Sequence, residues 1–315
     1  MRYKGLCPEI VRRIAIVGSG AIGCYYGARL VAAGMDVRFL ARSGYLALRE
    51  KGLGVKSPDG DLELGSVQAF RSAEDIGPVD LVVLAWKTTS NGSCREVISP
   101  LLHEGTVILA LQNGLGTTEY LAETFGGDRI YGGLCFVCIN RLAPNRINHI
   151  AQGLVTIGDF NGADPERLEQ LVSLFANAQI PCRAVEDLPT AQWVKLIWNV
   201  SFNGLCITEG GVTTEQLLAS AEGESRVRKI MGEVIDGATA LGMDIPASII
   251  DEQVVSTREM GSYRPSSLID YLEGREVELQ AIWAEPLGRA ERAGARLPAW
   301  NQLLADLRTR LAERV

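Results

Sequence analysis

One segment near the start of the chain, residues 13–42, constrains the fold more than any other. It reads RIAIVGSGAIGCYYGARLVAAGMDVRFLAR, which is a β-branched apolar run, a glycine-rich turn, a helical run that ends at Gly34, and a second apolar run. A strand, a helix and a strand in this order form a βαβ unit, in which the two strands lie parallel. The segment therefore predicts a parallel α/β sheet.

The turn in this segment has the spacing G-x-G-x-x-G, and its residues are Gly18, Ser19, Gly20, Ala21, Ile22 and Gly23. The motif is weak alone, but between a strand and a helix it forms the pyrophosphate site of a dinucleotide. The first glycine permits the tight turn, the second lets the backbone approach the phosphates, and the third lets the helix pack closely. We expect this turn to bind a dinucleotide cofactor.

The end of the second strand indicates which dinucleotide binds. Enzymes that use NAD usually carry a carboxylate there, whereas this chain has Arg42 followed by Ser43. A guanidinium suits the 2′-phosphate of NADP(H), because it donates bidentate, charge-assisted hydrogen bonds. We expect NADP(H), and the alternative is that Arg42 caps a surface loop.

Two further apolar runs, VDLVVLAWK and GTVILALQNG, have the composition of strands buried on both faces of a sheet. Lys87 and Asn113 follow these strands, and the carboxyl ends of parallel strands face the ligand in such sheets. We expect both residues to contact the cofactor, although a strand-end lysine is also often a solvated charge. The later segment NRINHIAQGLVTIGDF predicts a hairpin or an edge pair.

Helical patterns replace the strand signals in the last part of the chain. The sequence therefore predicts an N-terminal Rossmann-like, doubly wound α/β sheet over residues 1–187, followed by an all-α C-terminal domain over residues 188–315. Pro286 predicts a kink or a break in one of these helices.

The apolar helix WVKLIWNVSFN carries polar residues at four-residue intervals: Lys195, Asn199 and Asn203. On an α-helix they share one face, and leaving a buried amide unpaired costs about 1–3 kcal/mol. They therefore pair with protein groups or face a ligand. The chain has two histidines, neither in a catalytic context, and a lysine can donate the proton that carbonyl reduction requires. The alternative is a salt bridge from Lys195 and two helix-packing amides.

The composition excludes several classes of function. The chain has 315 residues and a net charge of −7, so it is long enough for two domains and lacks the basic surface that nucleic acid requires. Its apolar runs are too short to span a membrane and its start lacks the core of a signal peptide, so we expect a cytoplasmic protein.

The seven scattered cysteines predict reduced thiols rather than disulfides. The Cys135–Cys138 pair is interpreted as buried thiols, with redox or metal use as the alternative, and we expect no metal.

Together these segments resemble the ketopantoate reductase family, the 2-dehydropantoate 2-reductases. The matching stretches follow the family's order over nearly the whole chain and are GSGAIG, Arg42, the WK at Lys87, QNGLG, NHIAQGLVTIG, WVKLIWNVSFN and PSSLIDYLEGREVE. The resemblance implies NADPH-dependent reduction of 2-dehydropantoate to pantoate, a step towards pantothenate and coenzyme A.

The resemblance also implies residue roles. Lys195 takes the position of the general acid, and Glu278 takes that of a glutamate beside the nicotinamide end of the cofactor and the substrate. Lys87, Asn113 and Cys138 match cofactor contacts. The positions implied for substrate binding are Asn199, Asn203, Thr213, Tyr263 and Ser266.

Two departures from the family keep the substrate open. Ser267 stands where methionine is common, and Thr213 stands where an asparagine often binds substrate. One alternative is therefore a reductase of a different 2-oxo acid. Another is a non-catalytic NADP-binding sensor, against which the intact set of polar residues argues. We also expect a homodimer, because apolar helix faces of the second domain could bury against a second copy.

Overall fold

The computed structural model describes residues 11–162 and 164–314, so Cys7 and the first part of the predicted N-terminal domain lie outside the described residues. The chain divides into two compact units. The first unit comprises Met1–Gln112 and Thr117–Leu188, and the second comprises Asn113–Gly116 and Pro189–Val315. The short loop after one of the sheet strands therefore belongs, by its contacts, to the second unit.

A single sheet of ten strands, counted within the described residues, forms the centre of the first unit. Its order is β4-β3-β9-β8-β7-β6-β1-β2-β5, with β10 paired to β9. The strands are β1 (Arg13–Val17), β2 (Asp36–Leu40), β3 (Leu53–Lys56), β4 (Leu62–Leu64), β5 (Gln68–Phe70), β6 (Leu81–Leu84), β7 (Val107–Ala110), β8 (Ile130–Ala143), β9 (Arg146–Asp159) and β10 (Cys182–Ala184).

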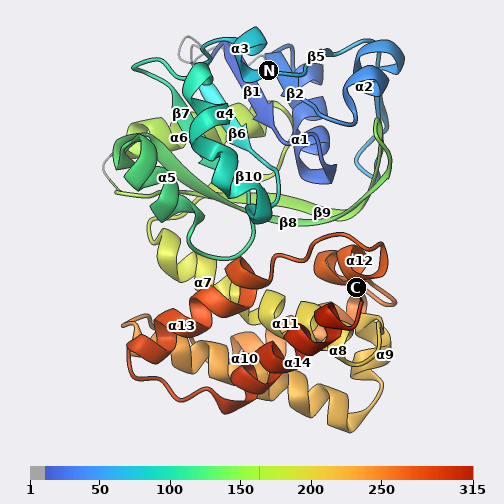
Figure 1. Cartoon of the computed structure of the whole chain (residues 1–315), viewed down its shortest axis with the longest axis vertical. Coiled ribbons are helices and arrows are strands. Elements are labelled where there is room, and N and C mark those ends of the chain that lie inside the picture. The colour runs from blue at the N-terminus through green and yellow to red at the C-terminus, as the bar shows by residue number, and fades with distance from the viewer. Residues whose placement is uncertain (1–10, 163, 315) are drawn as a thin grey trace, which may run out of the picture. The chain divides into compact units, whose positions relative to one another are not determined.

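The middle of this sheet is the predicted parallel core. Strand β1 pairs in parallel with β2 and β6, and β7 pairs in parallel with β6 and β8. The long hairpin of β8 and β9 is antiparallel and makes the sheet mixed (Figure 1). The segment around His149 is thus in a hairpin, as predicted, but it lies inside the sheet because β9 also pairs with β3 and β10.

Helices cover both faces of the sheet because inward-facing apolar residues alternate along its strands. Ile14 and Ile16 of β1 pack in one cluster with α1 (Ala21–Ala32), α2 (Tyr45–Lys51) and α6 (Pro165–Asn177). Ala15 and Val17 point to the other face and pack with α3 (Ala73–Ile76), α4 (Cys94–Ile98) and α5 (Thr117–Phe125). Burial on both faces explains why the strand sequences are continuously apolar. The predicted doubly wound α/β class is confirmed.

The second unit contains helices and loops but no strand within its described residues, which confirms the predicted all-α class. Its α-helices are α7 (Leu188–Trp198), α8 (Gly204–Thr208), α9 (Thr214–Leu218), α10 (Ala221–Ala240), α11 (Ile249–Glu259), α12 (Ser266–Leu272), α13 (Glu285–Arg292) and α14 (Pro298–Ala312). They enclose one apolar cluster, and its largest fully buried side chains are Trp193, Trp283 and Trp300.

Two π-helical turns interrupt these helices. The first π turn, Asn199–Asn203, joins α7 to α8, and the second π turn, Gln280–Ala284, precedes α13. Pro286 lies in the first turn of α13, directly after the second π turn, so the predicted break coincides with the change from π to α geometry. The wider π turn also means that Asn203 does not follow Asn199 with the α-helical rotation that the sequence reasoning assumed.

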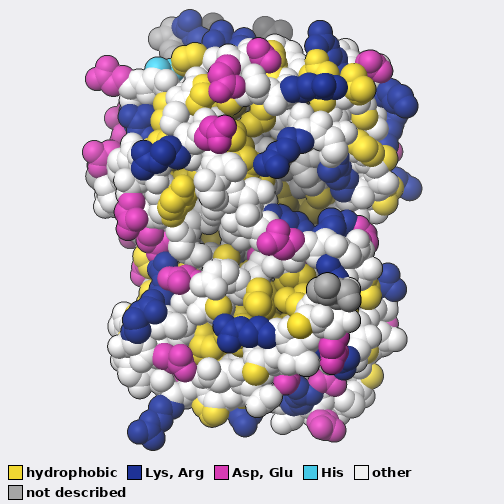
Figure 2. All heavy atoms as spheres, in the orientation of Figure 1, with side chains coloured by type: hydrophobic (Ala, Val, Ile, Leu, Met, Phe, Trp, Pro, Cys, Tyr) yellow, Lys and Arg dark blue, Asp and Glu magenta, His cyan; other side chains and the backbone are white. Residues whose placement is uncertain are grey.

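None of the helices within residues 11–162 and 164–314 is long and apolar enough to cross a membrane. On the face shown in Figure 2, basic and acidic side chains are interspersed over the surface.

Candidate active site

The glycine turn has the backbone that the motif predicts. Gly18 has φ of +108°, and a Cβ there would lie 2.3 Å from the backbone nitrogen of Trp86. A Cβ on Gly23 would lie 2.1 Å from the carbonyl oxygen of Gly18, so this glycine allows α1 to start against the turn. Gly20 differs, because a Cβ there would meet nothing within 4 Å. Its outer side is therefore open to a ligand.

A cavity of about 400 Å³ adjoins this turn. Gly18, Ser19 and Gly20 form part of its wall, together with Arg42. The other lining residues are Leu40, Ser43, Arg71, Ser72, Ala73, Glu74, Trp86, Ser90, Glu96, Val97 and Arg141. The guanidinium carbon of Arg42 lies 5.9 Å from the centre of the Trp86 ring, which is cation–π distance. Arg42 thus faces the same cavity as the glycine turn.

Other cofactor positions of the first unit lie outside this wall. Lys87 follows β6 and caps a 3₁₀ turn at Thr88–Ser93, and it is partly buried. Cys138 is 6% exposed on β8. Neither residue lines the cavity, so their predicted contacts to the cofactor stay predictions.

The polar stripe of the second unit is buried. Lys195, Asn199 and Asn203 are 8%, 9% and 1% exposed. The two asparagines differ in what they bind. The Oδ1 atom of Asn203 accepts a hydrogen bond from the backbone N–H of Ser267 at 2.9 Å, whereas the amide of Asn199 makes no hydrogen bond with a described residue. Asn203 therefore holds the N-terminus of α12, and Asn199 is available to a ligand.

Side chains of the second unit bind the carbonyl groups around the first π turn. The indole N–H of Trp283 donates to the carbonyl of Val200 at 3.0 Å. The Ser201 hydroxyl donates to the carbonyl of Ile197 at 2.7 Å. The Val200 carbonyl also accepts the Gly204 N–H, so the side-chain bonds add to the backbone hydrogen bonds of an otherwise rare geometry. π turns occur frequently at functional sites, and this one carries Asn199 and Asn203.

The remaining substrate positions lie at helix starts. Ser266 is the first residue of α12; its hydroxyl is exposed and makes no hydrogen bond with a described residue. Thr213 caps α9, and its hydroxyl accepts the N–H of Gln216 in a capping box. Tyr263 packs its ring 6.3 Å from that of Trp198. Ser266 is thus available to a substrate, whereas the Thr213 oxygen is engaged in the cap.

Glu278 and Asn113 lie near the second π turn. Glu278 is 8% exposed and lies two residues before this turn. The loop that carries Asn113 packs on the same turn, because the Leu115 N–H donates to the carbonyl of Ala281 at 3.0 Å. Gly114 has φ of +81°, and a Cβ there would lie 2.3 Å from that carbonyl oxygen. The glycine of the Asn-Gly pair therefore permits this close approach.

Sequence reasoning missed several residues of these sites. Arg71 and Arg141 line the cavity, but Arg71 follows the three-residue strand β5, which is too short to give a periodic signal. Trp283 reads as an ordinary core residue in sequence, since nothing there predicts that its N–H binds a π turn. Spacing alone indicates neither role.

The described cysteines are free thiols. Burial raises the pKa of Cys24, Cys94, Cys182 and Cys206 to about 12, so these thiols stay protonated at neutral pH. In Cys24 the charge of Arg141 opposes this effect, but burial is the larger cause. These four cysteines are inert structural residues.

The parallel βαβ core, with an open glycine turn and an arginine-lined cavity at the carboxyl ends of its strands, defines a dinucleotide-binding α/β protein of the Rossmann class. Comparison with known proteins gives the family. Residues 14–162 match the family described as "Ketopantoate reductase PanE/ApbA", and residues 187–310 match its C-terminal part. The chain belongs to the ketopantoate reductase family of oxidoreductases.

Individual relatives agree with this assignment. The chain is 38% identical to a 2-dehydropantoate 2-reductase of Nostoc over 94% of each chain. A crystal structure of a 2-dehydropantoate 2-reductase from Geobacter metallireducens is 44% identical, covers 94% of this chain and 99% of its own, and superposes with a TM-score of 0.92. A dimeric ketopantoate reductase from Staphylococcus aureus, 18% identical over 96% of this chain and 100% of its own, shares the fold with a TM-score of 0.81.

Proposed function

We propose that this protein reduces 2-dehydropantoate to pantoate with NADPH. The observation that carries the proposal is the buried pair Lys195 and Asn199, one helical turn apart, of which Asn199 has an amide without a protein partner. A buried amide without a partner is costly unless a ligand binds it. The family relationship over nearly the whole chain supports the same reaction.

The first unit fits a dinucleotide phosphate cofactor. Gly20 leaves its outer side open, α1 starts directly beyond it without an acidic residue in its first turn, and Arg42 presents a guanidinium to the adjoining cavity. A helix N-terminus and backbone N–H groups favour the pyrophosphate, and the guanidinium favours the 2′-phosphate. Bound NADPH supplies the hydride for the reaction.

Lys195 acts as the general acid in this proposal. Reduction of a ketone places negative charge on the carbonyl oxygen, and an ammonium group stabilises that charge and then donates the proton. Lys195 is 8% exposed, so it would act where water is largely excluded and electrostatic stabilisation is strong. Glu278, also 8% exposed, would orient the substrate and the nicotinamide end of the cofactor.

The structure favours different roles for the substrate-binding candidates. Asn199 and Ser266 have side chains without protein hydrogen bonds, so we assign them direct contacts to the substrate. Asn203 positions Ser266 indirectly, because its oxygen binds the neighbouring Ser267 N–H. Thr213 acts through the capping box that fixes the start of α9.

The two units would divide the work. Lys87, Cys138 and Asn113 would contact NADP(H), and the second unit would bind the 2-oxo acid, with Tyr263 among its contacts. We further propose that the protein acts in the cytoplasm as a homodimer through the second unit, where Leu241, Val255 and Leu272 expose 36%, 57% and 49% of their surfaces. Light scattering of the purified protein tests the dimer.

Turnover tests the reaction. Purified protein is mixed with NADPH or NADH and with 2-dehydropantoate or a panel of other 2-oxo acids, and cofactor oxidation is followed by absorbance. The expected result is turnover that is fastest with NADPH and 2-dehydropantoate. Faster reduction of another 2-oxo acid would support the proposed reaction type but would overturn the assignment of 2-dehydropantoate as the substrate. Binding of NADPH without reduction of any 2-oxo acid would overturn the enzymatic role.

A further inference from the structure

We propose that Arg71 is a second specificity residue for the cofactor, and that it forms with Arg42 a two-armed site for the 2′-phosphate of the adenosine ribose. This inference rests on the proposed use of NADPH. It assigns a role to a residue that the sequence motifs leave unassigned. Strand register, the surroundings of each guanidinium and the cavity that both residues line support this role.

The sheet brings the two arginines together. Strand β5 pairs in parallel with β2, with Phe70 in register with Leu40, and the Ala41 N–H donates to the carbonyl of Phe70 at 2.9 Å. Arg42 and Arg71 therefore follow the carboxyl ends of neighbouring strands. Ligands of open α/β sheets bind beyond these strand ends, and both residues line the cavity beside the glycine turn.

Aromatic rings support both guanidinium groups. Arg42 lies 5.9 Å from the ring centre of Trp86, and Arg71 lies 4.7 Å from that of Tyr45. Neither guanidinium makes a hydrogen bond or an ion pair with a residue that the structure describes. Stacking restrains each group while leaving its N–H donors free, which is the arrangement that binds phosphate in a bidentate manner.

The other charged residues of the cavity bear on whether it binds a 2′-phosphate or a 2′-hydroxyl. Arg141 also lines it, but its guanidinium donates to the carbonyl of Pro144 at 3.3 Å. Glu74 and Glu96 line it as well, and a carboxylate here could accept a hydrogen bond from a ribose hydroxyl, as in NAD enzymes. Two guanidinium groups without a hydrogen-bond partner among the described residues bind a phosphate dianion more strongly than they bind a neutral hydroxyl. The site therefore favours the 2′-phosphate.

The test compares Arg71→Gln with the matched control Arg49→Gln. Arg49 stacks on the same Tyr45 ring, 5.7 Å from its centre, and is exposed, but it does not line the cavity. Dissociation constants are measured by calorimetry for NADPH, for NADH, and for adenosine 2′,5′-bisphosphate as a probe. Arg71→Gln should raise the dissociation constants of NADPH and of the bisphosphate by about ten- to a hundredfold and leave that of NADH unchanged. Arg49→Gln should change none of them.

Equal weakening of NADPH and NADH by Arg71→Gln, or no change in either, would overturn the proposal. If Arg71→Gln fails to fold, Arg71→Lys replaces it in the test, because lysine keeps the charge but loses the planar, bidentate guanidinium. Arg71→Lys should lower the affinity for NADPH less than Arg42→Gln does and leave the affinity for NADH unchanged. These measurements need no substrate. A failure of the protein to reduce 2-dehydropantoate is therefore distinguishable from a failure of this inference.

Discussion

The indole N–H of Trp283 donates to the carbonyl of Val200 at 3.0 Å, and this bond joins the second π turn to the first. Both π turns lie beside proposed active-site residues, since the first carries Asn199 and the second follows Glu278. A single buried side chain thus connects the turn that carries Asn199, whose amide is the proposed substrate contact, with the turn that follows Glu278.

Replacing Trp283 by Phe should destabilise the protein mainly through this hydrogen bond. The matched control is Trp300→Phe, because Trp300 is equally buried in the same core and its indole nitrogen has no hydrogen-bond partner. Both changes lose volume, but only the first removes an indole hydrogen bond from a buried carbonyl, which keeps its bond from the Gly204 N–H. We expect Trp283→Phe to lower the free energy of unfolding by about 0.5–1.5 kcal/mol more than the control does, measured in urea, because one net hydrogen bond is lost. Equal losses would show that packing, and not the hydrogen bond, is what stabilises the π turn.

Lys195→Ala should abolish proton donation and leave cofactor binding intact. A positioned general acid contributes about 10²- to 10⁴-fold, so kcat should fall by that factor. The dissociation constant of NADPH, measured by fluorescence, should stay near that of the unchanged protein. Lys229→Ala, which removes an exposed lysine of α10, serves as the control and should retain full turnover. Near-normal kcat in Lys195→Ala would refute the proposed mechanism.

The two asparagines of the first π turn should respond differently to substitution. Asn203→Ala leaves the Ser267 N–H unpaired in a buried position, so it should lower the free energy of unfolding by about 1–3 kcal/mol. Asn199→Ala removes an amide without a protein partner and should leave stability nearly unchanged while raising KM for the 2-oxo acid. Thermal unfolding and steady-state kinetics on both variants separate these effects. A stable Asn203→Ala protein with a raised KM would instead place Asn203 in direct contact with the substrate.

The fold could be predicted because its signals are local. The strand–turn–helix of residues 13–42 and the continuous apolar strands reflect backbone rules and burial on both faces, which act over short segments. Strands β3, β4, β5 and β10 are three or four residues long and are specified by pairing with distant segments. Such strands leave no periodic signal in the sequence.

The sequence predicts candidate residues for the site, whose roles stay predictions, but not their geometry. The four-residue spacing singled out Lys195, Asn199 and Asn203 as candidates, yet it assumed an α-helix where the structure has a π turn. The distinction between Asn199 and Asn203 depends on the Ser267 N–H, which is 64 residues away in sequence. Arg71 was missed for a similar reason, since pairing between β5 and β2 brings it beside Arg42.

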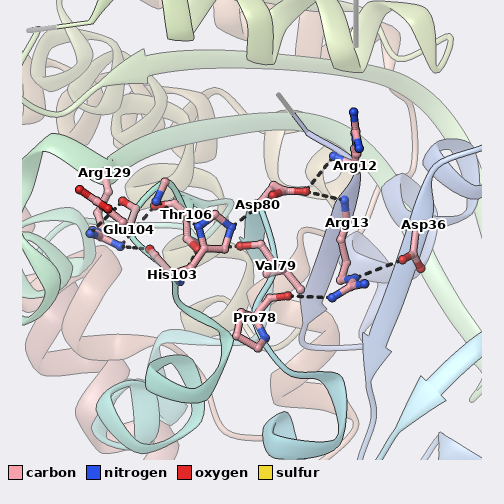
Figure 3. Close-up of polar contacts among 11 residues, drawn as sticks. Arg12, Arg13, Asp36, Pro78, Val79, Asp80, His103, Glu104, Thr106 and Arg129 are labelled. Atoms are coloured by element: carbon pink, nitrogen blue, oxygen red, sulfur yellow. Dashed lines mark hydrogen bonds and ion pairs between the residues drawn. The ribbon is translucent and has the colours of Figure 1, made fainter. Parts of the chain in front are cut away.

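Asp80 should make the free energy of unfolding depend on pH in the acid range. Its carboxylate accepts the backbone N–H groups of Arg12 and Arg13 and binds His103 at 3.2 Å (Figure 3). Burial opposes ionisation, but the hydrogen bonds from Arg13, Arg12 and His103 outweigh it and lower the pKa of Asp80 below its ordinary value. A lowered pKa means that the folded state favours the charged carboxylate. The contribution of the Asp80 carboxylate to the stability of the folded state is therefore complete above about pH 4, and it is lost as the pH falls through the pKa of the folded state.

Asp80→Asn should accordingly lower the free energy of unfolding by about 1–2 kcal/mol at pH 7, and the difference from the unchanged protein should shrink as the pH is lowered below about 4. Urea unfolding at a series of pH values measures this. Asp75→Asn, which changes an exposed aspartate of α3, is the control. A difference that stays constant from pH 7 to pH 3 would contradict the charge-based explanation.

Two alanine substitutions in the glycine turn should separate folding from cofactor binding. Gly18→Ala places a Cβ 2.3 Å from the Trp86 backbone at a φ of +108°, so it should destabilise the protein by at least about 2 kcal/mol. Gly20→Ala meets no atom within 4 Å and should fold normally, but its methyl group would occupy the open side where the phosphates approach. We expect it to weaken NADPH and NADH alike by at least about tenfold, because both share the pyrophosphate. Calorimetric unfolding and binding titrations test the pair, and unchanged NADPH affinity in a folded Gly20→Ala protein would show that the pyrophosphate binds elsewhere.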